Sequence, residues 1–317
     1  MKKLLLIIVM CISFFYSHSL AKTFNVNKTD MYFQTINSAL SRANDGDIII
    51  VGPGIFAESI EISNKNDIKI IGSGPNNTKI QSESTVDAVR ISNSSNINIT
   101  GFTIFSGGNS VYFNLGSGVI QNCFISASKN GVDVASASSN GAVTIKNCII
   151  NGCQSHGIYT RSVSTTVLNN TIVSNNRYGV MGDCFIKNNI IVFNGNKATS
   201  CTDKKYLSHN NLYNNRQNDP PDYVDLFLGE ISADPLFIDT ENFVLQAGSP
   251  CRDAGLMGPQ YIDPDGTRND MGAYGGPDAA IFWPYVSSGP IVTEIELTPS
   301  SVPKGTKIQL KARGVVR

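Results

Sequence analysis

The chain has 317 residues, enough for one large domain and a small appendage. Only 16% of its residues are charged, against about 25% in an ordinary globular domain. Its 25 basic and 25 acidic residues cancel, which argues against nucleic acid as a partner, because nucleic-acid binding needs a strongly basic surface. A polar but weakly charged exterior fits sugar hydroxyls, although an Asn-rich repeat would produce it as well.

The N-terminus has the pattern of a secretory signal peptide. Lys2 and Lys3 precede an apolar run over residues 4–16, and small residues at Ser19 and Ala21 indicate cleavage after Ala21. The apolar run is short for a membrane span, although an uncleaved anchor is the alternative. We expect residues 1–21 to be removed and the mature protein, without a transmembrane segment, to be extracellular, on the cell surface or periplasmic.

The first mature segment predicts a cap followed by a strand. Residues 33–40 have the pattern of a short amphipathic helix, and residues 45–56 that of a tight turn followed by a buried strand. Such a helix can close the open end of a stacked β-structure.

A repeat of short β-branched runs occupies the middle of the chain. One degenerate copy and five clear copies align at 99–104, 120–125, 145–150, 167–172, 186–191 and 207–212. Their starts are 21, 25, 22, 19 and 21 residues apart, a period that fits a coil of three short strands. The Leu ladder of a leucine-rich repeat is missing, and a β-sandwich would not keep Asn in register. Because strands this short cannot bury a face alone, we expect them to stack into a solenoid with coils about 4.8 Å apart.

Two further segments follow the repeat. The first, here called the exit segment, runs through residues 233–239, 243–255 and 270–275. After a Pro/Gly/Ser-containing stretch at 283–290, residues 292–310 alternate like two strands around a turn. These resemble the opening of a bacterial Ig-like domain, although about 25 residues cannot complete a sandwich of about 100. A truncated product and a lone hairpin both remain open.

In its N-terminal segment, its repeat and its exit segment, the chain resembles the right-handed parallel β-helix proteins of the pectate-lyase-like superfamily. The resemblance covers most of the mature chain, and the exit segment is similar to that of many bacterial exported members. It implies an all-β fold, a right-handed parallel β-helix with a short N-terminal capping helix. We expect a signal peptide at 1–21, the β-helix at 22–280, and a linker with a partial Ig-like segment at 281–317.

Four asparagines, Asn122, Asn147, Asn169 and Asn188, occupy one column of the repeat. In-register Asn side chains can bond to one another and to turn backbone, and Asn tolerates the left-handed conformation that such turns need. We predict a structural ladder here.

Cysteines occupy the neighbouring column, where Cys123 and Cys148 lie one copy apart. They form either a buried apolar stack or, because export allows it, a disulfide; Cys184 and Cys201 could close a further loop. The mature chain has only two histidines and no pair of CxxC motifs, so a zinc or copper centre is not expected.

The exit segment contains the best candidate for a metal site. Asp263, Asp265 and Asp270 surround a Gly in the string DPDGTRND, a pattern that can wrap oxygen ligands around calcium. The spacing is shorter than that of an EF-hand loop, and no Glu takes the last position. The alternative is a network of Asx turns with Arg268 paired to a carboxylate.

One cluster of residues could carry chemistry. If the valines on either side of Asp133 point inward, Asp133 points outward with Tyr159 on the next coil, flanked by His156 and Arg161. These residues could serve as acid, base and carboxylate clamp, or they could be ordinary surface residues. Met181, next in the column, does not extend the polar set.

Three of the family's catalytic patterns are not found, whereas the Lys or Arg base with calcium-binding acids of its lyase-like members is too loose a pattern to exclude from the sequence. The paired acids of a glycosidase, the Asp context of pectin methylesterases and the Asp-Pro-His-Asp string of uronate epimerases are all missing. We therefore expect a secreted or cell-surface protein that binds polysaccharide or serves a structural or adhesive role. The alternative is an enzyme, a polysaccharide lyase or glycoside hydrolase acting on uronic-acid-containing glycans, since fold alone does not decide function.

Overall fold

A computed structural model describes residues 21–29, 31–82, 85–127, 129–138, 141–201, 206–216 and 229–279, and the backbone of two strands at 291–298 and 309–315. Residues 1–20 lie outside this part, so the signal peptide stays a prediction. No described helix is long and apolar enough to cross a membrane.

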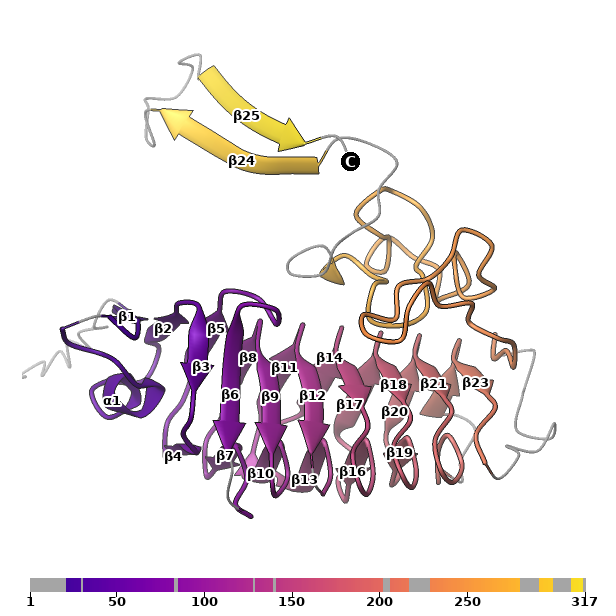
Figure 1. Ribbon diagram of the computed structural model, residues 1–317, viewed down its shortest axis with the longest axis horizontal. Helices are drawn as coiled ribbons and strands as arrows, with labels where there is room; N and C mark the ends of the chain where they lie inside the picture. The colour runs from indigo at the N-terminus through magenta and orange to yellow at the C-terminus, as the bar shows by residue number, and fades with distance from the viewer. Residues whose placement is uncertain are drawn as a thin grey trace, which may run out of the picture.

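The chain winds into a right-handed parallel β-helix, which confirms the predicted fold class (Figure 1). Each full coil, here called a rung, contributes one strand to each of three parallel sheets. Sheet 1 contains β1 (Thr23–Val26), β2 (Ile48–Val51), β5 (Lys69–Gly72), β8 (Ile97–Thr100), β11 (Gly118–Gln121), β14 (Val143–Lys146), β17 (Thr165–Leu168), β20 (Phe185–Lys187) and β22 (Leu207–Ser208). Sheet 2 contains β3 (Gly54–Phe56), β6 (Thr78–Ser82), β9 (Thr103–Ser106), β12 (Phe124–Ala127), β15 (Ile149–Asn151), β18 (Thr171–Val173), β21 (Ile190–Val192) and β23 (Asn211–Tyr213). Sheet 3 contains β4 (Ile60–Ser63), β7 (Val89–Ser92), β10 (Val111–Gly116), β13 (Val132–Ala137), β16 (Ile158–Thr160) and β19 (Val180–Met181).

A short helix caps the N-terminal end, as predicted. The helix α1 (Ile36–Leu40) begins after Thr35, whose hydroxyl accepts a hydrogen bond from the Ser38 amide at 3.2 Å. The Glu58 carboxylate accepts from two more amides of the first turn. The buried face of the helix, including Leu40, packs into the main core.

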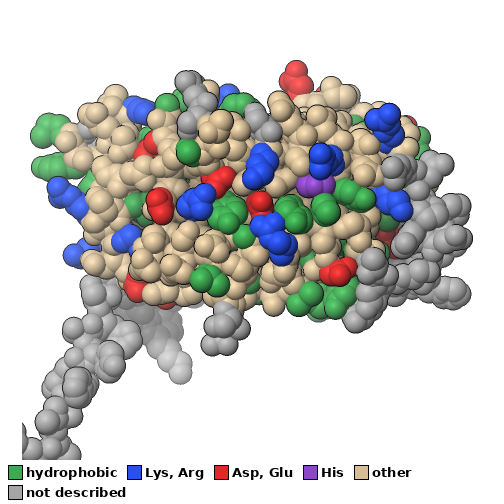
Figure 2. Space-filling view, turned by 90° about the horizontal axis from the view of Figure 1, so that it is seen from below, with side chains coloured by type: hydrophobic (Ala, Val, Ile, Leu, Met, Phe, Trp, Pro, Cys, Tyr) green, Lys and Arg blue, Asp and Glu red, His purple; other side chains and the backbone are tan. Residues whose placement is uncertain are grey.

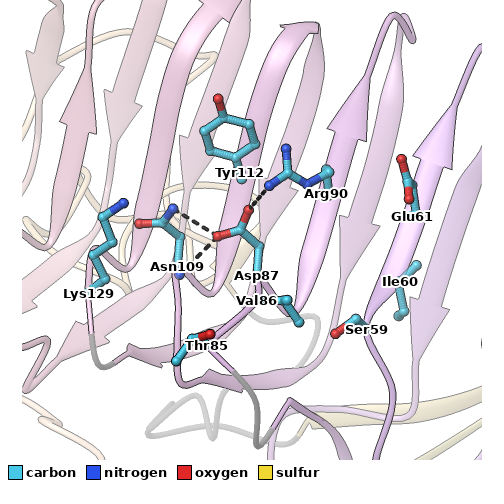
Figure 3. A pocket seen from close by; sticks show the side chains of 10 residues that line it. All are labelled: Ser59, Ile60, Glu61, Thr85, Val86, Asp87, Arg90, Asn109, Tyr112 and Lys129. Atoms are coloured by element: carbon cyan, nitrogen blue, oxygen red, sulfur yellow. Dashed lines mark hydrogen bonds and ion pairs between the residues drawn. The ribbon is translucent and has the colours of Figure 1, made fainter.

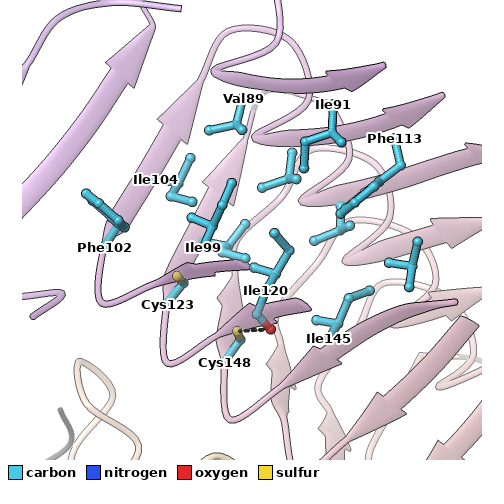
Figure 4. Close-up of a cluster of buried hydrophobic side chains, with 14 of the residues drawn as sticks. Val89, Ile91, Ile99, Phe102, Ile104, Phe113, Ile120, Cys123, Ile145 and Cys148 are labelled. Carbon is cyan, nitrogen blue, oxygen red and sulfur yellow. Dashed lines mark hydrogen bonds between the residues drawn. The ribbon is translucent and has the colours of Figure 1, made fainter. Parts of the chain in front are cut away.

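The interior is built from columns of identical or similar apolar residues. Alternation along each strand turns every second side chain inward, and the parallel register stacks it on its equivalent in the next rung. In sheet 1 the column runs Ile49, Ile70, Ile99, Ile120, Ile145, Val167, Ile186 and Leu207. All of these are buried, and they pack against inward residues of the other sheets (Figure 4).

A glycine precedes the strand of sheet 3 in three successive rungs, because the chain packs too closely there for a side chain. A Cβ at Gly157 would lie 2.7 Å from both the Gly179 oxygen and the Ile172 side chain. One at Gly131 would lie 2.6 Å from the Gly157 oxygen.

The cysteine column forms a buried stack. Cys123 and Cys148 are free thiols with no exposure, and each donates a weak bond to a strand carbonyl, that of Gln121 or Lys146, at 3.2 Å. Burial raises the pKa of the Cys148 thiol well above its ordinary value. Cys184 is a free buried thiol too, so the loop closure considered for it is not formed.

Residues 229–279, here called the C-terminal cover, lie against the outer face of sheet 2. Ile149, Val173 and Ile190 point outward from that sheet, yet they are buried in a second apolar cluster with residues of the cover such as Phe243 and Met271. The outer face is apolar where the cover lies, which explains why β15, β18 and β21 have hydrophobic residues on both faces.

The last described strands, β24 (Ile291–Thr298) and β25 (Gln309–Val315), pair as an antiparallel hairpin. This agrees with the alternation seen in the sequence. The Ig-like assignment and the domain limits at 22–280 and 281–317 stay predictions.

Candidate functional site

The outer face of sheet 3 carries a column of polar and aromatic side chains. The strand register places Asp133 between Tyr112 on the preceding rung and Tyr159 on the following one, with Met181 next, as period-2 alternation predicts. Earlier in the column stand Glu61 and Arg90. Figure 2 shows this face, on which Lys, Arg, Asp and Glu side chains border a band of hydrophobic side chains.

Asp133 is the buried centre of the predicted cluster. It is 4% exposed, and one carboxylate oxygen accepts from Arg161 Nη2 at 3.1 Å while the other accepts from Asn130 Nδ2 at 3.2 Å. Burial raises its pKa, and the charge of Arg161 and the Asn130 bond oppose this shift. The Arg161 guanidinium lies 4.5 Å from the centre of the Tyr159 ring, so acid, cation and aromatic ring form one unit.

A second unit of the same kind lies toward the N-terminus. Arg90 pairs with Asp87 at 2.7 Å, and its guanidinium lies 4.5 Å from the centre of the Tyr112 ring. In both units the acid side chain is buried, 8% exposed for Asp87 and 6% for Asp133. The arginines are half-exposed, so each unit presents a fixed cation beside a tyrosine.

A pocket of about 540 Å³ opens beside this second unit (Figure 3). It is lined by Ser59, Ile60, Glu61, Thr85, Val86, Asp87, Arg90, Asn109, Tyr112 and Lys129. Sequence reasoning missed Asp87 and Arg90, because the repeat is too degenerate before residue 99 to align them. The sequence signal that could have found them is an acid, Asp87, three residues before a base, Arg90, in a short strand with β-branched residues. Sequence reasoning also missed Lys129, which lies between two clear copies of the repeat.

His156 belongs to a column of side chains, at the edge of the same face, that accept hydrogen bonds from backbone amides. Asp87, Asn109 and Asn130 each accept a hydrogen bond from the backbone amide of the next residue in the column, at 3.1–3.3 Å. His156 Nδ1 accepts in turn from the Tyr178 amide at 3.3 Å. Burial and the charge of Arg177 lower the pKa of His156, and in the neutral ring an accepting Nδ1 leaves the proton on Nε2.

The structure therefore brings the four predicted residues together. The rings of His156 and Tyr159 lie 5.7 Å apart, and Arg161 joins Tyr159 to Asp133. However, Asp133 and His156 are buried, and the acceptor atoms named above are occupied by protein donors. The groups that face solvent are the tyrosine and the arginine, which suit binding better than proton transfer. Catalysis by these residues stays a prediction.

The four asparagines of the predicted column lie at the turn from sheet 1 to sheet 2. All have left-handed backbones, with φ between 50° and 57°. Their side chains bind mainly the C-terminal cover: Asn122 donates to the Asp278 carbonyl, Asn147 to Gly275 and Asn169 to Asp270, while Asn188 accepts from the Leu256 amide. One side-chain bond within the column joins Asn188 to Asn169, at 3.3 Å.

The continuous asparagine ladder lies one residue further on, in the column that the cysteines begin. Asn170 donates to Asn189 Oδ1, and Asn189 donates to Asn210 Oδ1, at 3.0 and 2.9 Å. Asn210 donates to Glu230, which ends the ladder. A parallel ladder joins Asn175, Asn194 and Asn215 at the turn from sheet 2 to sheet 3.

The three exit-segment acids lie near one another, and each accepts hydrogen bonds from the loop, so calcium binding here stays a prediction. Asp263 is 3% exposed and accepts from the amides of Asp270 and Gly276. Asp265 accepts from Thr267, and Asp270 from the Asp253 amide at 2.7 Å. No described group of His, Cys, Asp or Glu is placed to hold a metal ion. This arrangement is that of the Asx-turn alternative, although Arg268 donates to the Gly255 carbonyl rather than to a carboxylate.

The burial of Asp263 predicts a pH-dependent stability. Desolvation raises its pKa to about 7, against about 3.9 in an unfolded chain. Between these values the folded state holds a proton that the unfolded chain releases, so this group's stabilisation decreases as the pH rises from about 4 to about 7 and is constant above. Melting curves across this range should show a shallower pH dependence for Asp263→Asn than for the wild type; parallel curves would contradict the assignment.

Comparison with known proteins gives three kinds of likeness. Residues 87–220 match the family model described as a right handed beta helix region. A cell surface glycoprotein of Methanothermus fervidus is 33% identical over 131 residues, which are 39% of this chain and 21% of that protein. The chain therefore matches only about a fifth of its relative's length.

Among solved structures, the fold is similar to that of three carbohydrate-active enzymes. Pectin methylesterase PemA from Erwinia chrysanthemi is 12% identical, with a TM-score of 0.40 over 57% of this chain and 66% of that one. An alginate lyase from Paenibacillus is 17% identical, with a TM-score of 0.39 over 61% and 81%. Pectate lyase Pel9A is 15% identical, with a TM-score of 0.37 over 81% and 97%.

Proposed function

We propose that the protein binds a polysaccharide, outside the cytoplasm, on the outer face of sheet 3. The observation that carries this proposal is the pair of similar units on one face, Arg90 with Tyr112 and Arg161 with Tyr159, each anchored by a buried aspartate. Because an anchored arginine has already lost much of its side-chain freedom, a ligand binds it at a lower entropic cost.

The chemistry of these units suits sugars. Tyrosine offers a flat apolar ring together with a hydroxyl, and arginine offers a planar fork of donors to hydroxyl or carboxylate oxygens. A chain lying along the solenoid axis would meet Tyr112 and Tyr159, which stand two rungs, about 10 Å, apart. The predicted signal peptide and the likeness to a cell surface glycoprotein support a location at the cell surface.

The alternative, a lyase or hydrolase, is favoured by one observation. Burial raises the pKa of Asp133, as a general acid requires, and Tyr159 is its neighbour on the next rung. Release of reducing ends or unsaturated uronates by the wild type, lost in Asp133→Asn with the melting curve intact, would favour the enzyme over the binding protein.

We expect Tyr159→Ala to weaken binding of the preferred polysaccharide about tenfold, since it removes about 1–2 kcal/mol of ring and hydroxyl contacts. Tyr112→Ala should do the same. Affinity electrophoresis through gels containing different polysaccharides would measure this. Tyr32→Ala is the matched control, because Tyr32 is 78% exposed and precedes the solenoid's first full coil. Equal mobility of the wild type in every gel would overturn the proposed function.

A further inference from the structure

The pocket beside Arg90 and Tyr112 has charged side chains at both of its ends. Four charged residues line it: Glu61, Asp87, Arg90 and Lys129. In the register of sheet 3, Glu61 lies on the rung before Arg90, and Lys129 enters the rung after Tyr112. Glu61 and Lys129 therefore stand three rungs, or about 14 Å, apart along the solenoid axis.

The two charges between these ends balance each other. Arg90 Nη2 donates to Asp87 at 2.7 Å, and Figure 3 shows the guanidinium turned toward Asp87 and away from Glu61. The other Asp87 oxygen accepts from the backbone amide and from Nδ2 of Asn109, at 3.1 and 2.9 Å. Asp87 is thus paired and hydrogen-bonded, so the centre of the pocket is a neutral ion pair beside the Tyr112 ring.

Glu61 and Lys129 have no such partners. Both are exposed, and neither forms an ion pair or a side-chain hydrogen bond with a described residue. Burial raises the pKa of Asp133, and Lys129 lies near enough to oppose that rise, but Asp133 is already paired with Arg161 at 3.1 Å. The pocket therefore offers one unpaired anion at its N-terminal end and one unpaired cation at the other end.

We infer that this pocket binds a saccharide that carries a protonated amine on one sugar and an acidic group on another. This inference rests on the proposed function, because it names the ligand of the same face. The amine pairs with Glu61 and the acidic group with Lys129. The sugar between them packs against the Tyr112 ring and accepts hydrogen bonds from the remaining donors of Arg90. A volume of about 540 Å³ is within the usual range for a small-molecule pocket.

A saccharide with charges of one sign fits this pocket less well. An acidic chain places an anion beside Glu61, and a chain of free amino sugars places a cation beside Lys129, and like charges repel at such distances. A neutral chain leaves both side chains without a partner. Arg161 and Arg177 stand further along the face, outside the pocket, and favour every chain that carries acidic groups.

One saccharide backbone in four charge states tests the inference. The starting probe is a tetrasaccharide of alternating glucuronic acid and N-acetylglucosamine, which is acidic only. Removal of the acetyl groups gives the doubly charged probe, reduction of the carboxyl groups gives the neutral probe, and both changes give the amine-only probe. In titration calorimetry at low ionic strength and mildly acidic pH, where the amine is protonated, we expect the doubly charged probe to bind about fivefold or more tightly than each of the others.

Each of the two side chains should account for one part of this preference. In Glu61→Gln, the doubly charged probe should bind no better than the acidic probe. In Lys129→Gln, it should bind no better than the amine-only probe. Glu241→Gln and Lys79→Gln are matched controls at exposed positions outside the pocket, and both should keep the wild-type preference.

Two results would overturn the inference and keep polysaccharide binding. One is a singly charged or neutral probe that binds the wild type as tightly as the doubly charged probe, and the other is a preference that survives both pocket substitutions. Binding of no probe would also overturn the inference, whereas the proposed function would fail only if the wild type also migrates equally in every polysaccharide gel.

Discussion

Asn189→Ala should lower the free energy of unfolding by about 3–4 kcal/mol, a drop in Tm on the order of 10 °C. The Asn189 side chain accepts from the backbone and the side chain of Asn170 and donates to the Val167 carbonyl and to Asn210, all without exposure to water. Alanine leaves the Asn170 amide buried without its acceptor, and such a group carries its full desolvation cost.

The matched control for this substitution is Asn77→Ala. Asn77 is exposed and donates one bond, to the Ser73 carbonyl at 3.0 Å, so its loss should change stability by less than about 0.5 kcal/mol. Chemical denaturation of the three proteins measures both values. Equal midpoints for the two variants would mean that the ladder does not hold the rungs together.

Met271→Ala should destabilise the protein by about 2–5 kcal/mol, because Met271 is fully buried in the second apolar cluster. That cluster joins the C-terminal cover to the outer face of sheet 2. We expect the cavity left by the smaller side chain to weaken the cover and the sheet strands beneath it. Amides of β18 and β21 should therefore exchange faster with solvent in the variant.

Met257→Ala is the control here, since Met257 belongs to the same cover but is 73% exposed. It should leave the unfolding midpoint unchanged. If Met271→Ala also unfolds at the wild-type midpoint, the cover contributes nothing to the stability of the solenoid, and its cluster is a surface contact only.

The parallel β-helix was predictable because the residues of one repeat copy also indicate how the copies pack against one another. Short β-branched runs at a period of 19–25 residues can bury a face only by stacking on their own copies. The left-handed asparagines were predictable for a similar reason, since Asn is among the few residues that adopt that backbone, and Asn122, Asn147, Asn169 and Asn188 all do so. The rung neighbours Asp133 and Tyr159 followed from alternation along the strand together with the alignment of the repeat copies.

Three features depend on contacts between residues far apart in the sequence, and the sequence did not reveal them. The predicted asparagine column binds the C-terminal cover over separations of 68 to 156 residues, while the ladder itself lies in the next column. The outer face of sheet 2 is apolar because the cover lies on it.

Some residues of the candidate site were likewise predictable from the sequence, and others were found only in the structure. Sequence alone identified Asp133, His156, Tyr159 and Arg161, because they fall within copies of the repeat whose register could be counted. It missed Asp87, Arg90 and Lys129, whose places beside Tyr112 are set by stacked rungs of unequal length. Counting along a chain predicts which face a side chain takes, since the backbone alternates. Where the copies cannot be aligned, which side chains meet across that face is decided by the register between rungs, and there only the packed core determines it.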